Sequence, residues 1–506
     1  MTGHGSLRGL VLALCAVGFG PAAFAQDVLI ENVTIVASSG KPPIANGHVR
    51  VKDGRISEVG TGAVSQAAAA GATRVDGRGK FLTPGLMDSH VHVTNLAGLI
   101  DPHHDPGPVM QKLRDSYFRQ QPRSYLYFGV TQVIDLAQAG DGLATFTAQP
   151  LHPDLHHCGA VPVVDGYGID TSLEPGIRHK DTPFYLFEPA NAKEHPMPAG
   201  DDPKEHTPEA VVERIAGSGA ICVKVFIENG FGEASDLPLI SNDSLKRIRA
   251  AAHQRGLVLV AHANAIDMLR IAVANDVDVV AHGTWNWLES DRKPGVPEPI
   301  AAALREVHRK HIGYQPTQQV LVGLSGLFDP ATLADPVYPK VVPANVLAWY
   351  RTDAGNWFKN LLRMGFPPGM GDAQIKGILE TVGAQGGRAT KYLFDLGHPL
   401  LLGSDTPSAP SYANQPGYNT YLEIQKMARA GIPPRAIFDA ATVNNARQFK
   451  LERDYGEIAE GKVGNLLLLT ANPLESAEAW GRIDKVILRG KVLERKDLEP
   501  LQPPGD

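Results

Sequence analysis

The sequence predicts an α/β protein: a (β/α)8 barrel of the TIM type with a small β-sandwich-like domain built from both chain ends. In the middle of the chain, near-continuous apolar runs alternate with helical patterns, which is typical of a parallel sheet buried on both faces. There are eight such runs, enough to close a barrel. The 506 residues exceed the roughly 250 of a typical barrel and leave room for insertions.

The first 25 residues have the pattern of a signal peptide. Arg8 precedes an apolar run over residues 10–20, and Ala23-Phe24-Ala25 forms a small-x-small cleavage site. The apolar run is shorter than the roughly 20 residues that a bilayer span needs. We therefore expect cleavage after Ala25, an exported protein in the periplasm or outside the cell, and no integral membrane span.

Residues 26–83 and 456–506 are expected to form the β domain. Alternating strand patterns broken by turns run from Asp27 to Val75, and Asp53-Gly54 between two apolar runs is a hairpin signal. The same pattern returns between Asn465 and Leu493. Because both chain ends are β-rich and flank a long α/β middle, one small domain built from both ends is predicted.

Residues 84–455 are expected to form the barrel. Two stretches, 169–206 and 320–390, interrupt its alternation, and such insertions usually shape a substrate pocket or an oligomer contact; a homo-oligomer is therefore left open. Helices are predicted over 207–218, 241–255, 264–275, 421–430 and 434–449. The candidate strands are 85–93, 130–137, 160–168, 220–228, 257–265, 277–285, 311–319 and 399–407.

Composition limits the classes of partner. The net charge is −6 and no basic run occurs, so nothing favours binding to nucleic acid. Beyond the signal peptide only Cys158 and Cys222 remain, too few for a disulfide framework. Pairing of the two is an option, but buried free thiols are the favoured interpretation.

Polar residues able to bind metal follow several of the candidate strands. His90 and His92 lie one residue apart, so on a strand both point to the same side, and imidazole is the commonest protein ligand for transition metals. Taken singly, each such residue has an ordinary structural explanation. The C-terminal ends of barrel strands, however, form one ring where active sites lie. The further candidates at strand ends are Lys224, His262, His282 and Asp405.

Lys224 is the unusual member, because an ammonium group is no metal ligand. It stands between Val223 and Val225 and is expected to face the barrel interior, where an unpaired charge is costly. It is therefore either paired with carboxylates or chemically altered. Addition of CO2 would convert its amine into a carbamate, an anionic oxygen ligand able to bridge two cations.

Taken together, these segments resemble the amidohydrolase superfamily, nearest its binuclear branch of prolidase-like and imidazolonepropionase-related hydrolases. Two departures, Tyr421 where relatives often carry His and Gly464-Asn465 where Ala-Asp is common, bear on substrate class rather than on metal binding. The matching segments are FLTPGLMDSHVHV, VKVFIENG, VAHANA, VAHGTW, LLGSDTP, PGYNTYLEI, AIFDAATVNNARQF and GEIAEGKVGNLLLLTANPL.

The resemblance implies a site for two Zn²⁺ ions, with other divalent ions as an option. By the family pattern, His90, His92 and Asp405 hold the more buried ion, and His262 and His282 hold the more exposed one. Such a site cleaves amide or peptide-like C–N bonds in small molecules such as dipeptides or N-acyl amino acids.

The same resemblance implies that N6-carboxylated Lys224 and a hydroxide bridge the two ions. The hydroxide is the nucleophile, since metal coordination lowers the pKa of water. Asp405 accepts its proton and delivers it to the leaving nitrogen. Tyr167, expected at the end of the third strand, could bind the substrate or a tetrahedral oxyanion, or simply pack under the long loop.

Two rival interpretations remain. One is a mononuclear relative in which Lys224 stays an amine and the substrate is a cyclic amide or lactone. The other is a non-catalytic metal- or ligand-binding barrel, against which Asp405 argues, because a decayed site needs no proton acceptor. His103 and His104 are left out of the ligand set, because their Pro-rich polar surroundings are typical of a solvated loop.

Overall fold

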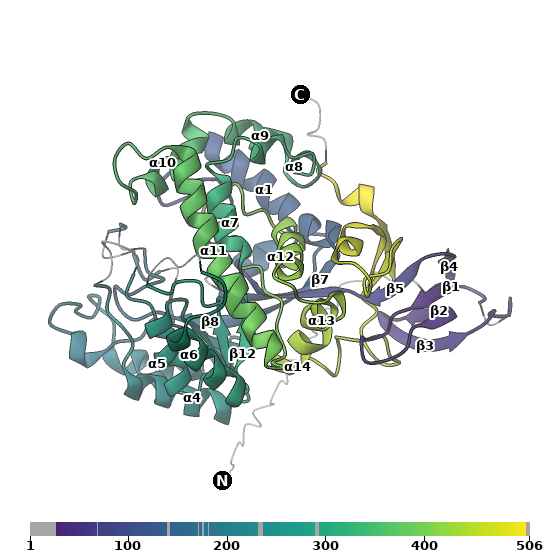
Figure 1. The fold of residues 1–506 in the computed structure, drawn as a ribbon, viewed down its shortest axis with the longest axis horizontal. Coiled ribbons are helices and arrows are strands. Elements are labelled where there is room, and N and C mark those ends of the chain that lie inside the picture. The colour runs from purple at the N-terminus through teal and green to yellow at the C-terminus, as the bar shows by residue number, and fades with distance from the viewer. Residues whose placement is uncertain are drawn as a thin grey trace, which may run out of the picture.

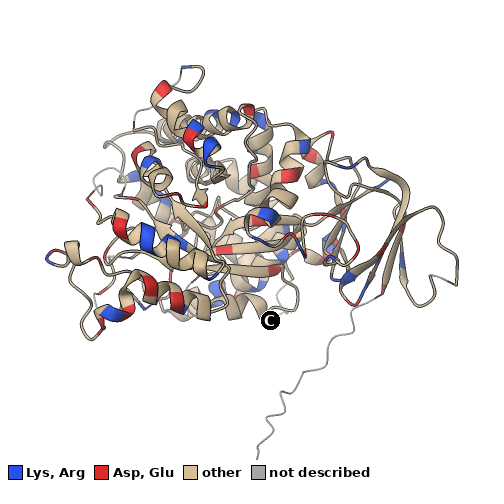
Figure 2. Cartoon of the chain, turned by 90° about the horizontal axis from the view of Figure 1, so that it is seen from below, with Lys and Arg blue, Asp and Glu red and all other residues tan. Residues whose placement is uncertain are grey.

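The computed structural model describes residues 27–501 apart from positions 68, 139–141, 171, 175–176, 181, 231–235 and 289–292. The predicted signal peptide lies outside the described residues. A barrel surrounded by helices adjoins a β domain, which lies at the right of Figure 1. In the part of the chain that the structure describes, no helix is long and apolar enough to cross a membrane. Acidic and basic residues alternate along the helices (Figure 2).

The barrel sheet is parallel, and its seven strands follow one another in sequence order. An eighth segment closes the ring, because Leu400 bridges Tyr314 on one side and Thr406 bridges Val91 on the other. The predicted barrel is therefore confirmed. Its strands are β6 (Leu86–Val91), β7 (Val130–Gln138), β8 (Asp154–Val161), β9 (Cys222–Phe226), β10 (Val258–His262), β11 (Val279–Ala281) and β12 (Gly313–Gln315).

Amphipathic helices cover the outside of the barrel. In α6 (Glu298–Arg309), Ile300, Leu304 and Val307 are buried, the three- and four-residue spacing of one helix face. Side-chain caps fix where some helices begin: the Thr207 hydroxyl accepts a hydrogen bond from a backbone N–H of α3. The other helices after the barrel strands include α3 (Pro208–Gly217), α4 (Asn242–Gln254) and α5 (Ile266–Ala274).

The two predicted insertions differ in structure. The described part of 169–206 is mostly irregular, with short 3₁₀ turns at Pro189–Asn191 and Pro203–His206. The stretch 320–390 is largely helical. The remaining helices are α1 (Pro108–Tyr127), α2 (Gly142–Thr147), α7 (Gln319–Gly326), α8 (Tyr338–Val341), α9 (Ala344–Tyr350), α10 (Trp357–Arg363), α11 (Asp372–Asp395), α12 (Tyr418–Arg429), α13 (Pro434–Asp439) and α14 (Asn445–Gln448).

The β domain is one mixed sheet to which both chain ends contribute. Its order is β15-β14-β13-β5-β1-β2-β3, with β4 also pairing with β1. Leu82 of β5 lies opposite Leu468 of β13, which joins the two ends, and Asp53 and Gly54 form the predicted hairpin turn with φ of 51° and 77°. The strands are β1 (Val28–Ile35), β2 (Ile44–Lys52), β3 (Arg55–Thr61), β4 (Thr73–Asp76), β5 (Phe81–Pro84), β13 (Leu466–Leu469), β14 (Ile483–Leu488) and β15 (Lys491–Glu494).

The third barrel strand lies earlier in the chain than the sequence predicts. It spans Asp154–Val161 rather than 160–168. Its first four residues are only partly buried and include His156 and His157, so the apolar pattern that marks a barrel strand begins only at Cys158. Tyr167 consequently lies in the turns beyond the strand.

The expectation of free thiols is wrong, because Cys158 and Cys222 form a disulfide. The two residues are direct partners in the pairing of β8 with β9, and their Cα atoms lie 4.4 Å apart. Their separation of 64 positions hides this adjacency in the sequence. Cys222 and Lys224 share one face of β9, so the disulfide lies one layer below Lys224 inside the barrel.

Candidate metal centre

The structure brings all seven predicted site residues to one cavity of about 760 Å³ at the C-terminal ends of the barrel strands. His90 lies near the end of β6, His262 is the last residue of β10, and Asp405 lies on the closing segment. The predicted residues that line this cavity, the metal cavity, are His90, His92, Tyr167, Lys224, His262, His282 and Asp405.

Asp405 is the centre of the cluster. Its Oδ1 lies 2.8 Å from His92 Nε2 and 3.2 Å from His90 Nε2. Its Oδ2 lies 3.2 Å from His282 Nδ1. One ligand atom each of His90, His282 and Asp405 lies within 4.8 Å of the others, a spacing that fits shared coordination of an ion.

The hydrogen bonds around His90 fix its tautomer. Gln315 Nε2 donates to the backbone oxygen and to the hydroxyl of Ser89, both at 2.8 Å. Gln315 therefore presents Oε1 to His90 Nδ1 at 3.1 Å and accepts a hydrogen bond from the Nδ1–H group. The other nitrogen, Nε2, is an acceptor that faces Asp405 and is buried without a hydrogen-bond partner among the described residues. A partner on the outer nitrogen is the usual support of a metal-binding histidine.

His262 has a comparable arrangement on the other side of the cavity. Its ring centroid lies 4.5 Å from that of His282 and 4.4 Å from that of Tyr167. Its Nε2 lies 3.5 Å from Glu228 Oε2 and 3.4 Å from Asn264 Nδ2, so two polar side chains lie beside this ring nitrogen. Glu228 is 1% exposed, and burial raises its pKa to about 7.

Burial sets the charges of the cluster. It lowers the pKa of His90 to about 4 and those of His262 and His282 well below 6.5, so these rings are neutral near pH 7. Burial alone would raise the pKa of Asp405, but its interactions with His90 and His282 outweigh burial and hold the pKa well below its ordinary value. Metal ligands must be deprotonated, and these three rings and Asp405 already are.

Lys224 is 1% exposed. Burial lowers the pKa of its amine to about 7, against the attraction of Asp405 and Asp135. A large fraction of the amine is then neutral near pH 7, whereas an ordinary lysine with a pKa near 10.4 is almost fully charged. A neutral amine is the form that adds CO2, so Lys224 fits the predicted carbamate.

The backbone is strained at two of the predicted ligands. His282 has φ of 81° and Asp405 has φ of 53°, in the left-handed region that side chains other than glycine rarely adopt. Each such residue costs on the order of 1–3 kcal/mol, and such strain gathers at functional sites. Here it aims both side chains at the cluster.

Two buried carboxylates that the sequence analysis left unassigned hold the strand ends together. Asp88 Oδ1 accepts from the backbone N–H groups of His90 at 3.2 Å and Ser404 at 3.0 Å, which ties β6 to the closing segment. Asp135 Oδ2 accepts from the N–H of Val93 at 2.6 Å. Asp88 and Asp135 could have been found in the sequence by the feature that marks Lys224, a charged residue within an apolar strand.

Of the residues left out of the ligand set, His103 lines the metal cavity from its exposed rim. His104 is exposed and lies 3.1 Å from Asp170. Tyr167, although it lies beyond β8, does reach the cavity.

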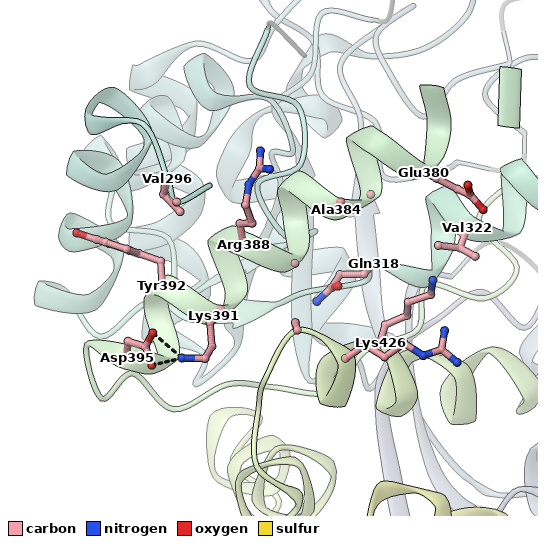
Figure 3. Close-up of a pocket in the computed structure, with 15 residues that line it drawn as sticks. Val296, Gln318, Val322, Glu380, Ala384, Arg388, Lys391, Tyr392, Asp395 and Lys426 are labelled. Carbon is pink, nitrogen blue, oxygen red and sulfur yellow. Dashed lines mark hydrogen bonds and ion pairs between the residues drawn. The ribbon is translucent and has the colours of Figure 1, made fainter. Parts of the chain in front are cut away.

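A second large cavity, of about 620 Å³, lies between α11 and α12 (Figure 3). Its lining includes Arg388, Lys391, Asp395 and Lys426 but no histidine or cysteine among the described residues. We call it the helix cavity. Its chemistry is not that of a transition-metal site.

Comparisons with known proteins agree with this geometry. The model of the Amidohydrolase family matches residues 388–493. Imidazolonepropionase from Stenotrophomonas maltophilia (strain R551-3) is 26% identical over 274 residues, which cover 47% of this chain and 58% of that protein. The chain thus spans less than two thirds of this curated relative.

Solved structures match over nearly the whole chain. A Xaa-Pro dipeptidase with bound methionine in the active site is 18% identical, with a TM-score of 0.62 over 93% of this chain and 100% of the other. The A. niger ochratoxinase is 20% identical, with a TM-score of 0.63 over 93% and 96%. At such identities the structures show the fold. The family match and the imidazolonepropionase match make this chain similar to the amidohydrolase superfamily, and the solved structures agree with it in fold.

Proposed function

We propose that this protein is a zinc-dependent amidohydrolase that cleaves an amide or peptide-like C–N bond in a small molecule. The observation that carries the proposal is the meeting of four histidines, Asp405 and Lys224 in one cavity. The pKa shifts described above leave three of the rings neutral and the carboxylate ionised near pH 7. Buried polar groups are normally satisfied, and here His90 Nε2 and His92 Nδ1 lack partners among the described residues.

The residues fit two ions. His90, His92 and Asp405 would hold one, and His262 and His282 the other, with carboxylated Lys224 between them. When bound, the ions would supply an activated water and polarise the substrate carbonyl.

The protein's own groups then handle the proton. Asp405 is ionised and touches three histidines at one edge of the cavity, so its free electron pairs can accept a proton from the attacking water. The same oxygen can pass that proton to the leaving nitrogen, which must be protonated before the C–N bond breaks. Tyr167, beside His262, is placed to donate a hydrogen bond to the substrate. Burial raises the pKa of Tyr167 above its ordinary value, so its hydroxyl stays protonated near pH 7.

Metal analysis and a substrate screen test the proposal. Purified protein reconstituted with zinc should hold two equivalents per chain and hydrolyse members of dipeptide, N-acyl amino acid or cyclic amide libraries. His92→Ala should lose metal and turnover. His253→Ala, whose ring pairs with Asp278 at 2.8 Å on the outside of the barrel, should change neither.

The rival functions give different results. One equivalent of metal together with an unmodified Lys224 would favour the mononuclear relative, and a lactone library tests its alternative substrate. Two equivalents without turnover of any amide, peptide or lactone would favour the non-catalytic barrel and contradict the proposal.

We also infer that the protein is exported. The signal-peptide pattern of residues 1–25 suggests it, and the disulfide between Cys158 and Cys222 supports it, since disulfides persist in oxidising compartments. Expression with the native leader should yield a periplasmic or secreted protein that begins at Gln26. A protein that stays in the cytoplasm with its leader intact would contradict this.

A further inference from the structure

A third cavity opens from the metal cavity. It has a volume of about 760 Å³, and we call it the side cavity. The two cavities share part of their lining, so one molecule can extend from the metal cluster into the side cavity. The shared residues are Thr94, Asn95, Asp101, Phe358, Ser408 and Ala409.

The side cavity is lined mainly by apolar side chains. Leu96, Leu99 and Ile100 come from the loop after β6, and Trp357 and Leu361 come from α10. No lysine or arginine lines it among the described residues. An anionic ligand group therefore has no charged partner there, whereas an alkyl or aryl group would lose contact with water.

Three polar residues that line the side cavity, His104, Asp170 and Ser172, are already paired with one another. His104 Nε2 lies 3.1 Å from Asp170 Oδ2, and the Ser172 hydroxyl donates to Asp170 Oδ1 at 2.5 Å. The Ser408 hydroxyl, at the boundary with the metal cavity, is buried without a partner among the described residues. It is free to bond a polar atom close to the scissile amide.

Helix α10 contributes apolar side chains to both cavities. Phe358 and Leu362 line the metal cavity. Trp357 and Leu361, together with Phe358, line the side cavity. Each pair is four residues apart and so shares one helix face. No residue of α10 is fully buried, and Leu361 is 54% exposed.

The polar face of α10 fixes these side chains in place. Lys359 Nζ donates to Asp372 at 2.8 Å, and Arg363 pairs with the same carboxylate. Both cations also lie over the ring of Phe328. These contacts of Lys359 and Arg363 hold α10 in place. The apolar side chains of the helix therefore stay directed at the two cavities.

We propose that the side cavity binds a large apolar alkyl or aryl substituent of the substrate, so that the preferred substrates are amides carrying such a group. This rests on the amidohydrolase function proposed above and narrows its substrate class. The acyl half and the amine half of the amide are both able to carry the group, and paired substrate series distinguish them.

The test uses the zinc-loaded protein and two series of N-acyl amino acids. One lengthens the acyl chain on alanine from acetyl to hexanoyl, and the other enlarges the amino acid of an N-acetyl compound from alanine to phenylalanine. A buried methylene is worth about fourfold in affinity. In at least one series kcat/KM should therefore rise on the order of a hundredfold. No rise in either series overturns the proposal.

Leu361→Glu places a charge in the side cavity wall. It should reduce the ratio of kcat/KM between the largest and smallest substrates at least tenfold. Met364→Glu is the matched control, because Met364 follows α10 directly, is 81% exposed and lines neither cavity. This control should leave the ratio unchanged; an equal loss in both variants would count against the side cavity.

A binding measurement separates this proposal from the proposed function. If no amide is hydrolysed, the proposed function fails, and calorimetry with decanoate and acetate still tests the side cavity. Decanoate should bind much more tightly than acetate, and Leu361→Glu but not Met364→Glu should weaken it. Equal affinity for the two acids, or equal weakening by both variants, overturns the proposal.

Discussion

The metal cavity and the helix cavity are similar in size, about 760 and 620 Å³, but they differ in how their polar atoms are satisfied. In the helix cavity Lys391 pairs with Asp395 one helical turn away (Figure 3), and Arg388 lies 4.7 Å over the ring of Trp287. In the metal cavity His90 Nε2 and His92 Nδ1 are buried without hydrogen-bond partners among the described residues, and so are both oxygens of Glu228 beside His262.

The difference shows that volume alone does not identify a functional site. A surface ion pair contributes little to the stability of the protein, and it needs no ligand to satisfy its charges. A buried polar group without a partner is costly, so it persists where a ligand or ion satisfies it. The helix cavity also contains lysine and aspartate residues. Substitutions of these residues are matched controls for substitutions of Lys224 and Asp405.

Replacing His90 by Ala should have the largest effect. It removes a ligand and leaves Asp405 with one fewer partner, so at least one zinc and nearly all turnover should be lost, since a catalytic ion needs about three protein ligands. Elemental analysis and steady-state assays measure both. Retention of two equivalents would contradict the ligand assignment.

Lys224→Ala should nearly abolish activity, and propionate should restore part of it by supplying a replacement oxygen bridge. Lys224→Arg should also be inactive, because a guanidinium stays cationic. Lys426→Ala is the control: its pKa is lowered by burial and by the charge of Arg429, but it lies in the helix cavity. Failure of rescue together with density for an unmodified amine would favour the mononuclear alternative.

Asp405→Asn should lower turnover by roughly 10²–10⁴, the range of general acid–base catalysis, while metal content falls less. Asn has a similar shape but cannot accept the proton. Asp395→Asn in the helix cavity should leave turnover unchanged. If Asp405→Asn turns over at a near-native rate, another group carries the proton.

Glu228→Gln should weaken the binding of the ion at His262 by roughly 10–100-fold, the usual effect of altering a group that supports a metal ligand, because it removes a carboxylate that lies 3.5 Å from His262 Nε2. Competition with a chelator measures this directly. Glu380→Gln is the control, since this carboxylate of the helix cavity pairs with Lys376 at 2.7 Å. Equal affinities in the two variants would show that Glu228 does not orient His262.

Lys391→Ala should have the smallest effect. The ion pair with Asp395 is partly exposed, so its loss should change the free energy of unfolding by less than about 1 kcal/mol, with no change in metal content or turnover. Denaturant titration measures the first. A large loss of activity would show that the helix cavity is coupled to the metal cavity.

The predicted ligands could be found from the sequence because each follows an apolar run of strand length, and strand ends meet in a barrel. The role of Gln315 and the partners of Asp88 could not be found from the sequence, because they depend on which strands are neighbours, and sequence spacing does not show that. The same holds for the pairing of Cys158 with Cys222. The third strand was misplaced because its first half, at the N-terminal end of the barrel, carries polar, partly buried residues.

The closing segment has a consequence for biosynthesis. His92 and Asp405 lie 313 positions apart, and Thr406 beside Asp405 completes the barrel by bridging to Val91. At roughly 5–20 residues per second, the ribosome needs about 15–60 s between the two residues. We therefore expect the nascent chain to carry histidines without a complete set of ligands until Asp405 has been made, so that the proposed metal site can form only once the closing segment joins the barrel.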